Sequence, residues 1–165
     1  MSTFDIFLVP KASQYSKYTK IINSFAKKYR TPSFPHITIL SMIEAKEKDL
    51  VAKVKRIIED FSKIEVEIFG INFTNTVNQC VFAQIKMSSQ LLTLYKTLGT
   101  NLHYSDQSPF FPHMSLVYGD YSPEEKSSIA KQVKVDKKLL LDTVVIYRDG
   151  PLPSDWLHVV DFKLH

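Results

Sequence analysis

The sequence of 165 residues predicts an α+β fold, built as one domain or one two-lobed unit. Strand-like and helix-like segments alternate along the whole chain, and no linker or low-complexity tract separates them. Hydrophobic residues make up 44% of the chain and charged residues 23%, which is enough apolar content for a buried core. We therefore expect residues 1–165 to form a single bilobal domain.

Seven strands are expected, because seven segments are short apolar runs or alternate apolar with polar residues between turn signals. In chain order they are residues 4–9, 36–41, 64–73, 79–87, 113–118, 139–147 and 156–164. Pro10 stops the first strand, and proline-containing turns over residues 31–35 and 108–112 precede the second and the fifth. A further turn, over residues 149–153, joins the last two strands.

Four helices are expected between these strands, because apolar side chains recur there at helical spacing. In chain order they are residues 13–29, 46–61, 88–102 and 122–133. Ser13 is the expected N-cap of the first helix, and either Ser88 or Ser89 is that of the third. The fourth begins with Ser-Pro-Glu-Glu, which places an N-cap at Ser122, a proline at the first helical position and acids in the first turn.

The composition excludes several classes of function. Lysine and arginine number 21 against 17 acids, and this charge of +4 suits a phosphate-bearing ligand but is too small for a protein that coats nucleic acid. Cys80 is the only cysteine, which excludes a disulfide framework and a zinc finger, and the four glycines lie too far apart for a Walker or dinucleotide-binding loop. With no signal peptide and no apolar run near the roughly 20 residues of a membrane span, we expect a soluble, cytoplasmic protein.

One hexapeptide pattern occurs twice. Residues 34–39 read Phe-Pro-His-Ile-Thr-Ile and residues 111–116 read Phe-Pro-His-Met-Ser-Leu, so the pattern Phe-Pro-His-aliphatic-hydroxyl-aliphatic recurs after 77 positions. One match at a given position has a chance on the order of one in a million. Each copy also follows a proline turn, starts a predicted strand and precedes a predicted helix, so the two copies indicate an internal repeat.

Strand periodicity places the polar side chains of each copy together. His36 and Thr38 lie at positions i and i+2 and share one face of their strand, as do His113 and Ser115. The aliphatic residues between them point into the core. If the two strands are related by an approximate two-fold axis, the two histidine–hydroxyl pairs face each other across a cleft.

Two facing histidines predict acid–base chemistry at a phosphorus centre. With an ordinary pKa near 6.5, one imidazole accepts a proton from water while the other donates one to the leaving oxygen. The hydroxyls of Thr38 and Ser115 would donate to phosphate oxygens. The scheme needs no metal and no cofactor. A zinc site is disfavoured because the other histidines and Cys80 lack ligand spacing, and a serine nucleophile because no Gly-x-Ser-x-Gly elbow occurs.

On these residues the chain resembles the 2H phosphoesterase superfamily, whose mark is a pair of His-x-Thr/Ser motifs on strands. Within it, the chain is similar to the cyclic phosphodiesterases of plant and fungal type. The similar features are residues 4–10, 35–38, 79–82, 112–118 and 122–126 and the late Trp156. The resemblance implies a bilobal fold with pseudo-two-fold symmetry, in which two antiparallel sheets flank a central cleft and helices pack outside. Plant members carry further cysteines, so redox control through them has no counterpart here.

The resemblance also implies a function, that of a metal-independent phosphoric diester hydrolase. The substrate would be a nucleoside 2',3'-cyclic phosphate, opened to the 2'-phosphate, or ADP-ribose 1'',2''-cyclic phosphate. His36 and His113 would be the catalytic acid and base, in an order that the sequence leaves open, and Thr38 and Ser115 would bind the phosphate.

Three aromatic residues are further candidates for substrate binding. Tyr118 would reach the phosphate or its water, although strict alternation puts it opposite His113 unless the strand twists or ends first. Phe7 would line the base-binding side, and Phe82 is the other aromatic candidate. For both phenylalanines the alternative is simple packing in the core.

Two other functions stay open. The chain could be a 2H enzyme of RNA metabolism, acting on cyclic RNA ends or 2',5'-linked oligoadenylate, although no basic stripe with interleaved aromatics supports a long RNA ligand. It could also be a non-catalytic module that binds nucleotides or RNA, although such a module would not require both histidines and both hydroxyls. We expect a monomer whose partners are its substrate or RNA termini, with no membrane partner.

Overall fold

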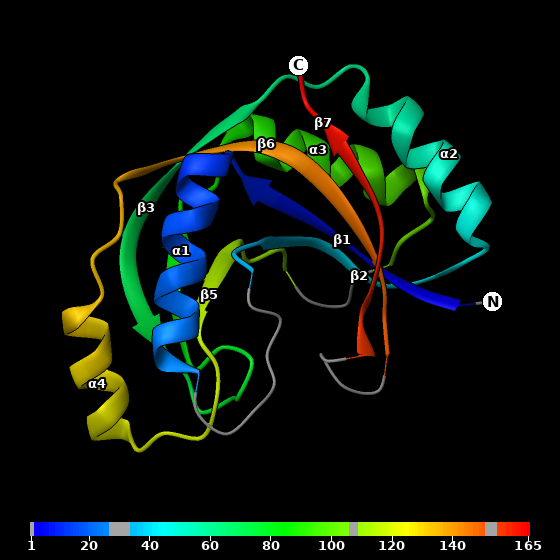
Figure 1. The fold of residues 1–165 in the computed structure, drawn as a ribbon. Helices are drawn as coiled ribbons and strands as arrows, with labels where there is room; N and C mark the ends of the chain where they lie inside the picture. Colours follow the sequence, from blue (N-terminus) through cyan, green and yellow to red (C-terminus); the bar gives the residue numbers. More distant parts are fainter. Residues whose placement is uncertain (1, 27–33, 106–108, 151–154) are drawn as a thin grey trace.

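The computed structural model describes residues 2–26, 34–105, 109–150 and 155–165, and its chain alternates strands and helices (Figure 1). The four helices and seven strands expected from the sequence are all present, and every strand pair is antiparallel, which confirms the α+β class. The elements are β1 (Ser2–Pro10), α1 (Ala12–Phe25), β2 (Ile37–Ala45), α2 (Glu47–Ile58), β3 (Ile64–Phe73), β4 (Val81–Ile85), α3 (Ser89–Asn101), β5 (His113–Val117), α4 (Pro123–Gln132), β6 (Lys138–Arg148) and β7 (Leu157–Lys163).

The chain contains the unit β-α-β-α-β twice, first as β1 to β3 and then as β4 to β6. The strand order β2-β1-β6-β3-β4-β5 is symmetric about its centre, so each element of the first unit has an equivalent in the second. The last strand of each unit pairs with strands of the other unit, because β6 lies beside β1 and β3 lies beside β4. We call β2-β1-β6-β7 the first lobe and β3-β4-β5 the second lobe.

Strand β3 joins the two lobes. Its residues Ile64 to Glu67 pair with β6, and its residues Ile68 to Phe73 pair with β4. The two parts of the sheet are therefore connected by hydrogen bonds through a single strand. Helices α1 and α3 also contact both lobes, α1 through β1 and β5 and α3 through β2 and β3.

Apolar side chains on the inner faces of the helices and on alternate strand positions form one continuous core. In α2, for example, Leu50, Val54, Ile57 and Ile58 are buried on one stripe while the lysines and acids of the helix face water. In β1, Phe4, Ile6 and Leu8 point into this core, so Asp5 and Phe7 point to the opposite face. That opposite face carries the candidate site.

The first helix departs from the sequence expectation at both ends. It begins at Ala12 with Lys11 rather than Ser13 at the N-cap, because the carbonyl of Lys11 already accepts the amides of Gln14 and Tyr15. It ends at Phe25, where Ala26 turns extended, whereas the helical pattern runs to residue 29. The hydroxyl of Tyr121, distant in sequence, donates to the carbonyl of Phe25 and gives this helix end a tertiary partner.

Two other elements, α2 and β4, are shorter than expected. Helix α2 ends at Ile58 instead of residue 61, and β4 covers Val81–Ile85 instead of residues 79–87. Before β4, the amide of Thr74 bonds to the carbonyls of Gln79 and Cys80, which closes a loop where the strand was expected to start. The turns expected over residues 31–35, 108–112 and 149–153 lie partly outside the described residues. None of the helices in the described ranges has the length and apolar character needed to cross a bilayer.

Two helix starts agree with the sequence. Ser88 caps α3 by accepting the amide of Leu91. Ser122 caps α4 in a complete capping box, in which its hydroxyl accepts the amide of Glu125 and the Glu125 carboxylate accepts the amide of Ser122.

The capping box yields a stability prediction. Ser122→Ala removes the acceptor for the Glu125 amide and should lower the free energy of unfolding by about 1 kcal/mol. Urea unfolding followed by circular dichroism measures the change. Ser127→Ala, in the middle of the same helix, is the matched control and should cost less. Equal costs for the two variants would show that the cap contributes nothing.

Candidate active site

A cleft of about 510 Å³ opens between the two lobes. Its wall includes residues from both edge strands, β2 and β5, from strand β1, and from Asp149, just after β6. Six of the seven residues expected at the site lie on this wall, namely Phe7, His36, Thr38, His113, Ser115 and Tyr118. The seventh, Phe82, does not: it is 3% exposed and lies behind the ring of His113.

The pairing registers show that the repeat extends to the neighbouring strands. Thr38 on β2 lies opposite Phe7 on β1, and Ser115 on β5 lies opposite Phe82 on β4. Phe7 and Phe82 are therefore equivalent positions of the two lobes. Only Phe7 contributes to the cleft wall, and it is almost fully buried.

Both histidines are held by the same hydrogen bond. The Nδ1 atom of His36 lies 3.1 Å from the carbonyl oxygen of Phe34, and that of His113 lies 2.9 Å from the carbonyl oxygen of Phe111. Because a carbonyl oxygen only accepts, Nδ1 must carry the proton in each ring. The neutral imidazole then presents an unprotonated Nε2, which is the atom a proton acceptor needs.

Aromatic rings fix the orientation of each imidazole. The ring of His36 packs between Phe7, at 4.3 Å between centroids, and Phe34, at 4.6 Å. The ring of His113 contacts Phe82 edge to face at 5.5 Å and Phe111 at 5.6 Å. The phenylalanine of each Phe-Pro-His motif is thus a direct support of the histidine two residues later.

Burial keeps both histidines neutral at pH 7 in the free protein. The pKa of His36 is lowered to about 4, chiefly by loss of solvent; the hydrogen bond to Phe34 opposes this shift, and the nearby charge of His113 contributes to it. Loss of solvent also lowers the pKa of His113, again opposed by its carbonyl partner. That the charge of His113 acts on His36 agrees with the two imidazoles facing one cleft.

The hydroxyl groups of the second lobe form a short chain beside His113. The Ser115 hydroxyl donates to the carbonyl of Asn78 at 2.7 Å. Burial raises the pKa of Tyr118, and a hydrogen bond with Ser115 opposes this rise. Strand β5 ends at Val117, so Tyr118 leaves the strand alternation and lies on the cleft wall with His113.

Eight further residues of the cleft wall were not proposed as site residues from the sequence, among them Gln79, Trp156 and Asp5. Gln79 lies with its side-chain nitrogen 3.1 Å from Nε2 of His113, and an amide nitrogen there donates to the unprotonated ring nitrogen. Trp156 packs against Phe7 with an angle of 28° between the two ring planes. Both residues belong to the segments that carry the family resemblance, which is the signal that could have identified them.

Asp5 is the third addition. It is 5% exposed, and its carboxylate accepts the amide of Met42 at 3.0 Å. The pKa of Asp5 is raised to about 6, chiefly by burial. The hydrogen bond from Met42 opposes this rise, and the charge of Asp149 adds to it. A single acid within the apolar run of residues 4–9 was the sequence signal for this position. Among the described residues, no three His, Cys, Asp or Glu side chains are grouped so as to hold a metal ion.

Comparison with known proteins places this geometry in context. The family model described as "2'-5' RNA ligase superfamily" matches residues 10–150. A cyclic phosphodiesterase from Arabidopsis thaliana is 17% identical over 126 residues, which are 76% of this chain and 70% of that protein.

Solved structures with the same fold include two bacterial proteins. LigT of E. coli complexed with 3'-AMP superposes with a TM-score of 0.62 at 15% identity, covering 99% of this chain and 98% of that one. The protein TT0787 of Thermus thermophilus gives a TM-score of 0.68 at 16% identity, covering 98% and 97%. These likenesses concern the fold, including its antiparallel sheet and four helices.

The contact between Gln79 and His113 leads to a prediction. Donation from the Gln79 amide stabilises the neutral ring, so Gln79→Ala should raise the pKa of His113 toward its ordinary value. NMR titration of the histidine ring protons measures this pKa. Gln79→Glu, which presents a carboxylate to the same nitrogen, should raise it further. A pKa that falls or stays constant in both variants would contradict the proposed direction of the hydrogen bond.

Proposed function

The chain belongs to the 2'-5' RNA ligase superfamily, as the resemblance to the 2H phosphoesterases predicted, and we propose that it hydrolyses cyclic phosphates by acid–base catalysis between His36 and His113. The observation that carries the proposal is the convergence of the two repeat motifs on one cleft. Each motif presents an imidazole anchored through Nδ1, with a hydroxyl two residues later on the same strand face.

The proposed reaction is a single displacement at phosphorus. One imidazole accepts a proton from water through Nε2 while the water oxygen forms a bond to phosphorus. The bond from phosphorus to one ester oxygen breaks, and the second imidazole, protonated, donates its proton to that oxygen. Both histidines return to their starting states after one proton exchange with solvent.

The reaction requires one protonated histidine, whereas both are neutral in the free protein at pH 7. A bound cyclic phosphate carries a negative charge, and a negative charge close to a histidine raises the pKa of that histidine. We propose that the substrate itself brings one imidazole into its protonated form. This coupling discriminates in favour of anionic ligands.

The hydroxyls would bind the non-bridging phosphate oxygens. Thr38 extends from the first lobe and Ser115 from the second, so donors from both lobes would hold the same phosphate. To donate to the substrate, the Ser115 hydroxyl must give up its hydrogen bond to the Asn78 carbonyl and form one to the phosphate. The hydroxyl of Tyr118, which is hydrogen-bonded to Ser115, can then donate to the Ser115 oxygen.

The cleft favours a nucleotide-sized substrate. Its volume of about 510 Å³ lies within the range of pockets that bind small molecules. Phe7 and Trp156 provide stacked rings beside His36, where a base or sugar would pack. Consistent with the similarity to a cyclic phosphodiesterase, we propose nucleoside 2',3'-cyclic phosphate, opened to the 2'-phosphate, and ADP-ribose 1'',2''-cyclic phosphate as substrates.

RNA with a terminal cyclic phosphate is a second candidate substrate. The observation that favours it is Phe111, which is 49% exposed beside His113, whereas its equivalent Phe34 is buried. An exposed ring next to the proposed reacting group gives a stacking surface for a base of a longer chain.

The central test removes each imidazole. His36→Ala and His113→Ala should each lower kcat for adenosine 2',3'-cyclic phosphate by about 10²–10⁴-fold, since each removes the acid or the base. Product formation is followed by chromatography that separates the 2'- from the 3'-phosphate, with EDTA present throughout. His165→Ala, at the exposed end of the chain, is the matched control and should be fully active. Full activity in either cleft variant would refute the assignment.

The lowered pKa values predict an acidic optimum. The value of kcat/KM reports the free protein, in which the acid must be protonated and the base neutral. Because both pKa values lie below 6.5, the rate should fall as pH rises through the higher of the two, which puts the optimum below pH 6.5. The optimum of kcat should lie at higher pH, because bound phosphate raises the pKa of the acid. A kcat/KM optimum above pH 7 would contradict this picture.

A further inference from the structure

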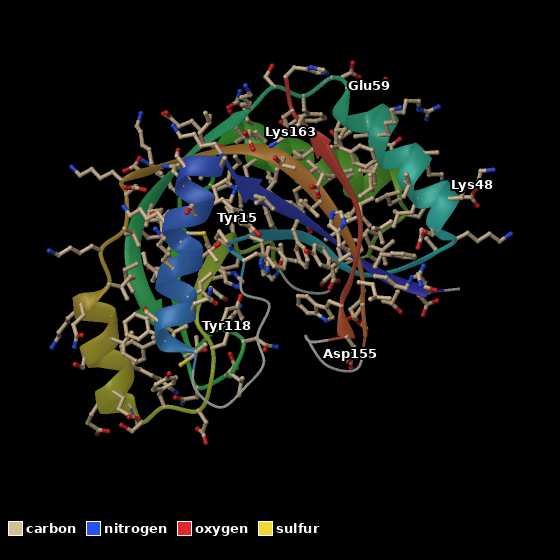
Figure 2. All side chains as sticks on the ribbon, viewed as in Figure 1. Tyr15, Lys48, Glu59, Tyr118, Asp155 and Lys163 are labelled. Atoms are coloured by element: carbon tan, nitrogen blue, oxygen red, sulfur yellow. The ribbon has the colours of Figure 1, made fainter. Side chains whose placement is uncertain are left out.

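A second hollow lies beside the cleft on the same face of the first lobe. It has a volume of about 300 Å³, and we call it the aromatic pocket. Its principal lining residues are Tyr15, Phe34, Val145, Tyr147, His158 and Asp161. Figure 2 labels Tyr15 on α1 and Lys163 on β7, which lie at its borders.

Strand alternation shows that the two hollows open on one face. On β1, Phe7 lines the cleft and Val9, two residues later, lines the aromatic pocket. On β6, Tyr147 and Val145 line the pocket, and Asp149, just after the strand, lines the cleft. A ligand that occupied both hollows would therefore run along this face of the sheet, past the ring of Phe34.

The ring of Phe34 separates the two hollows. It lies 4.6 Å from the ring of His36 on the cleft side and stacks on Tyr147 at 5.0 Å, with an interplanar angle of 12°, on the pocket side. The ring of His158 meets Tyr147 edge to face at 5.4 Å. The ring of Phe34 thus lies between His36, a proposed catalytic residue, and the pocket. The walls of the pocket are largely aromatic.

A carboxylate is placed among these rings. Asp161 lies opposite Val145 in the register of β6 and β7, and its Oδ1 atom is 2.7 Å from Nε2 of His158. Burial raises the pKa of Tyr15 and of Tyr147, and the charge of Asp161 raises both further, which places the two phenols near this carboxylate. The pocket therefore combines flat apolar walls with a hydrogen-bond acceptor that carries a negative charge.

We propose that the aromatic pocket binds a nucleobase attached beyond the ribose of the cyclic phosphate, one that carries an exocyclic amino group, while the cyclic phosphate occupies the cleft. Aromatic walls stack on the faces of a base, and a carboxylate accepts hydrogen bonds from an amino group such as N6 of adenine. The volume of about 300 Å³ is at the lower end of the range for ligand pockets, which suits a base rather than a whole nucleotide. This inference rests on the proposed function.

The chemistry of a cyclic phosphate dictates how this base is attached to the phosphorylated ribose. The ring closes two neighbouring hydroxyls of one ribose, so the substrate continues only through the 5' oxygen of that ribose. In RNA this oxygen leads through one phosphate to the preceding nucleotide. In ADP-ribose 1'',2''-cyclic phosphate it leads through a pyrophosphate to adenosine. Lys163 lines the pocket and its side chain is 70% exposed; its ammonium group pairs with Asp142 at 3.3 Å and would have to exchange this partner to bind such a linking phosphate.

Calorimetric titration of wild-type protein and variants with three ligands tests the inference. Adenosine 2'-phosphate carries no group on the 5' oxygen of its phosphorylated ribose, whereas adenylyl-(3',5')-adenosine 2'-phosphate and ADP-ribose 1''-phosphate carry an adenosine attached to the 5' oxygen of that ribose through one and two phosphates. Tyr15→Ala should raise the Kd of at least one of the latter two about tenfold and leave that of adenosine 2'-phosphate unchanged. Ser16→Ala, on the exposed side of the same helix, is the matched control.

A second variant probes the carboxylate without removing a ring. Wild-type protein should bind adenylyl-adenosine 2'-phosphate more tightly than uridylyl-adenosine 2'-phosphate, because uracil has no exocyclic amino group. Asp161→Asn should abolish this preference. Because the change is nearly isosteric and Asp161 is half exposed, it should leave the fold intact.

The outcomes separate this inference from the proposed function. If Tyr15→Ala weakens all three ligands equally, the pocket holds the first base, and if it weakens none, the pocket is not a binding site; either result overturns the inference. Which of the two longer ligands loses affinity identifies RNA or ADP-ribose as the source of the base in the pocket. Failure of wild-type protein to hydrolyse adenosine 2',3'-cyclic phosphate would refute the proposed function, while the binding results would still decide on the pocket.

Discussion

The site depends on a hydrogen bond of one kind, made twice: the Nδ1–H group of a histidine donates to the carbonyl two residues before it. The intervening proline has no amide proton and a restricted backbone, which favours the extended geometry that presents this carbonyl. The bond selects the tautomer, and with it the ring nitrogen that is left unprotonated. Without it, a buried imidazole could carry its proton on either nitrogen, and the two lobes would not present matching groups to the cleft.

The two lobes share a plan but differ in their surroundings. His36 lies between two buried phenylalanines in the lobe that also carries β7, whereas His113 lies beside the exposed ring of Phe111 and accepts a hydrogen bond from Gln79. Burial consequently lowers the pKa of His36 strongly. The repeat thus supplies two equivalent imidazoles in different surroundings, and under the proposed mechanism these two would take opposite roles in proton transfer.

Much of this was readable from the sequence, because the signals were local. Period-two spacing put His36 with Thr38, and the Ser-Pro-Glu-Glu start of α4 formed the expected N-cap at Ser122. What could not be read depends on residues distant in the chain. Helix α1 ends where Tyr121 reaches its last turn, and Phe82 packs behind His113 although its register equivalent Phe7 lines the cleft. Gln79 was overlooked because nothing in the local pattern reveals which side chain will meet the ring of His113.

The continuity of the sheet through β3 has a mechanical consequence. A motion that pulled the lobes apart within the sheet would have to break the backbone ladder of β3 with either β6 or β4, and both ladders are packed in the core. Bending of β3 between these two ladders breaks neither of them, and the pairing register shifts there, between Ile68 and Gly70. A change in the width of the cleft that keeps the sheet intact is therefore a bend of this one strand.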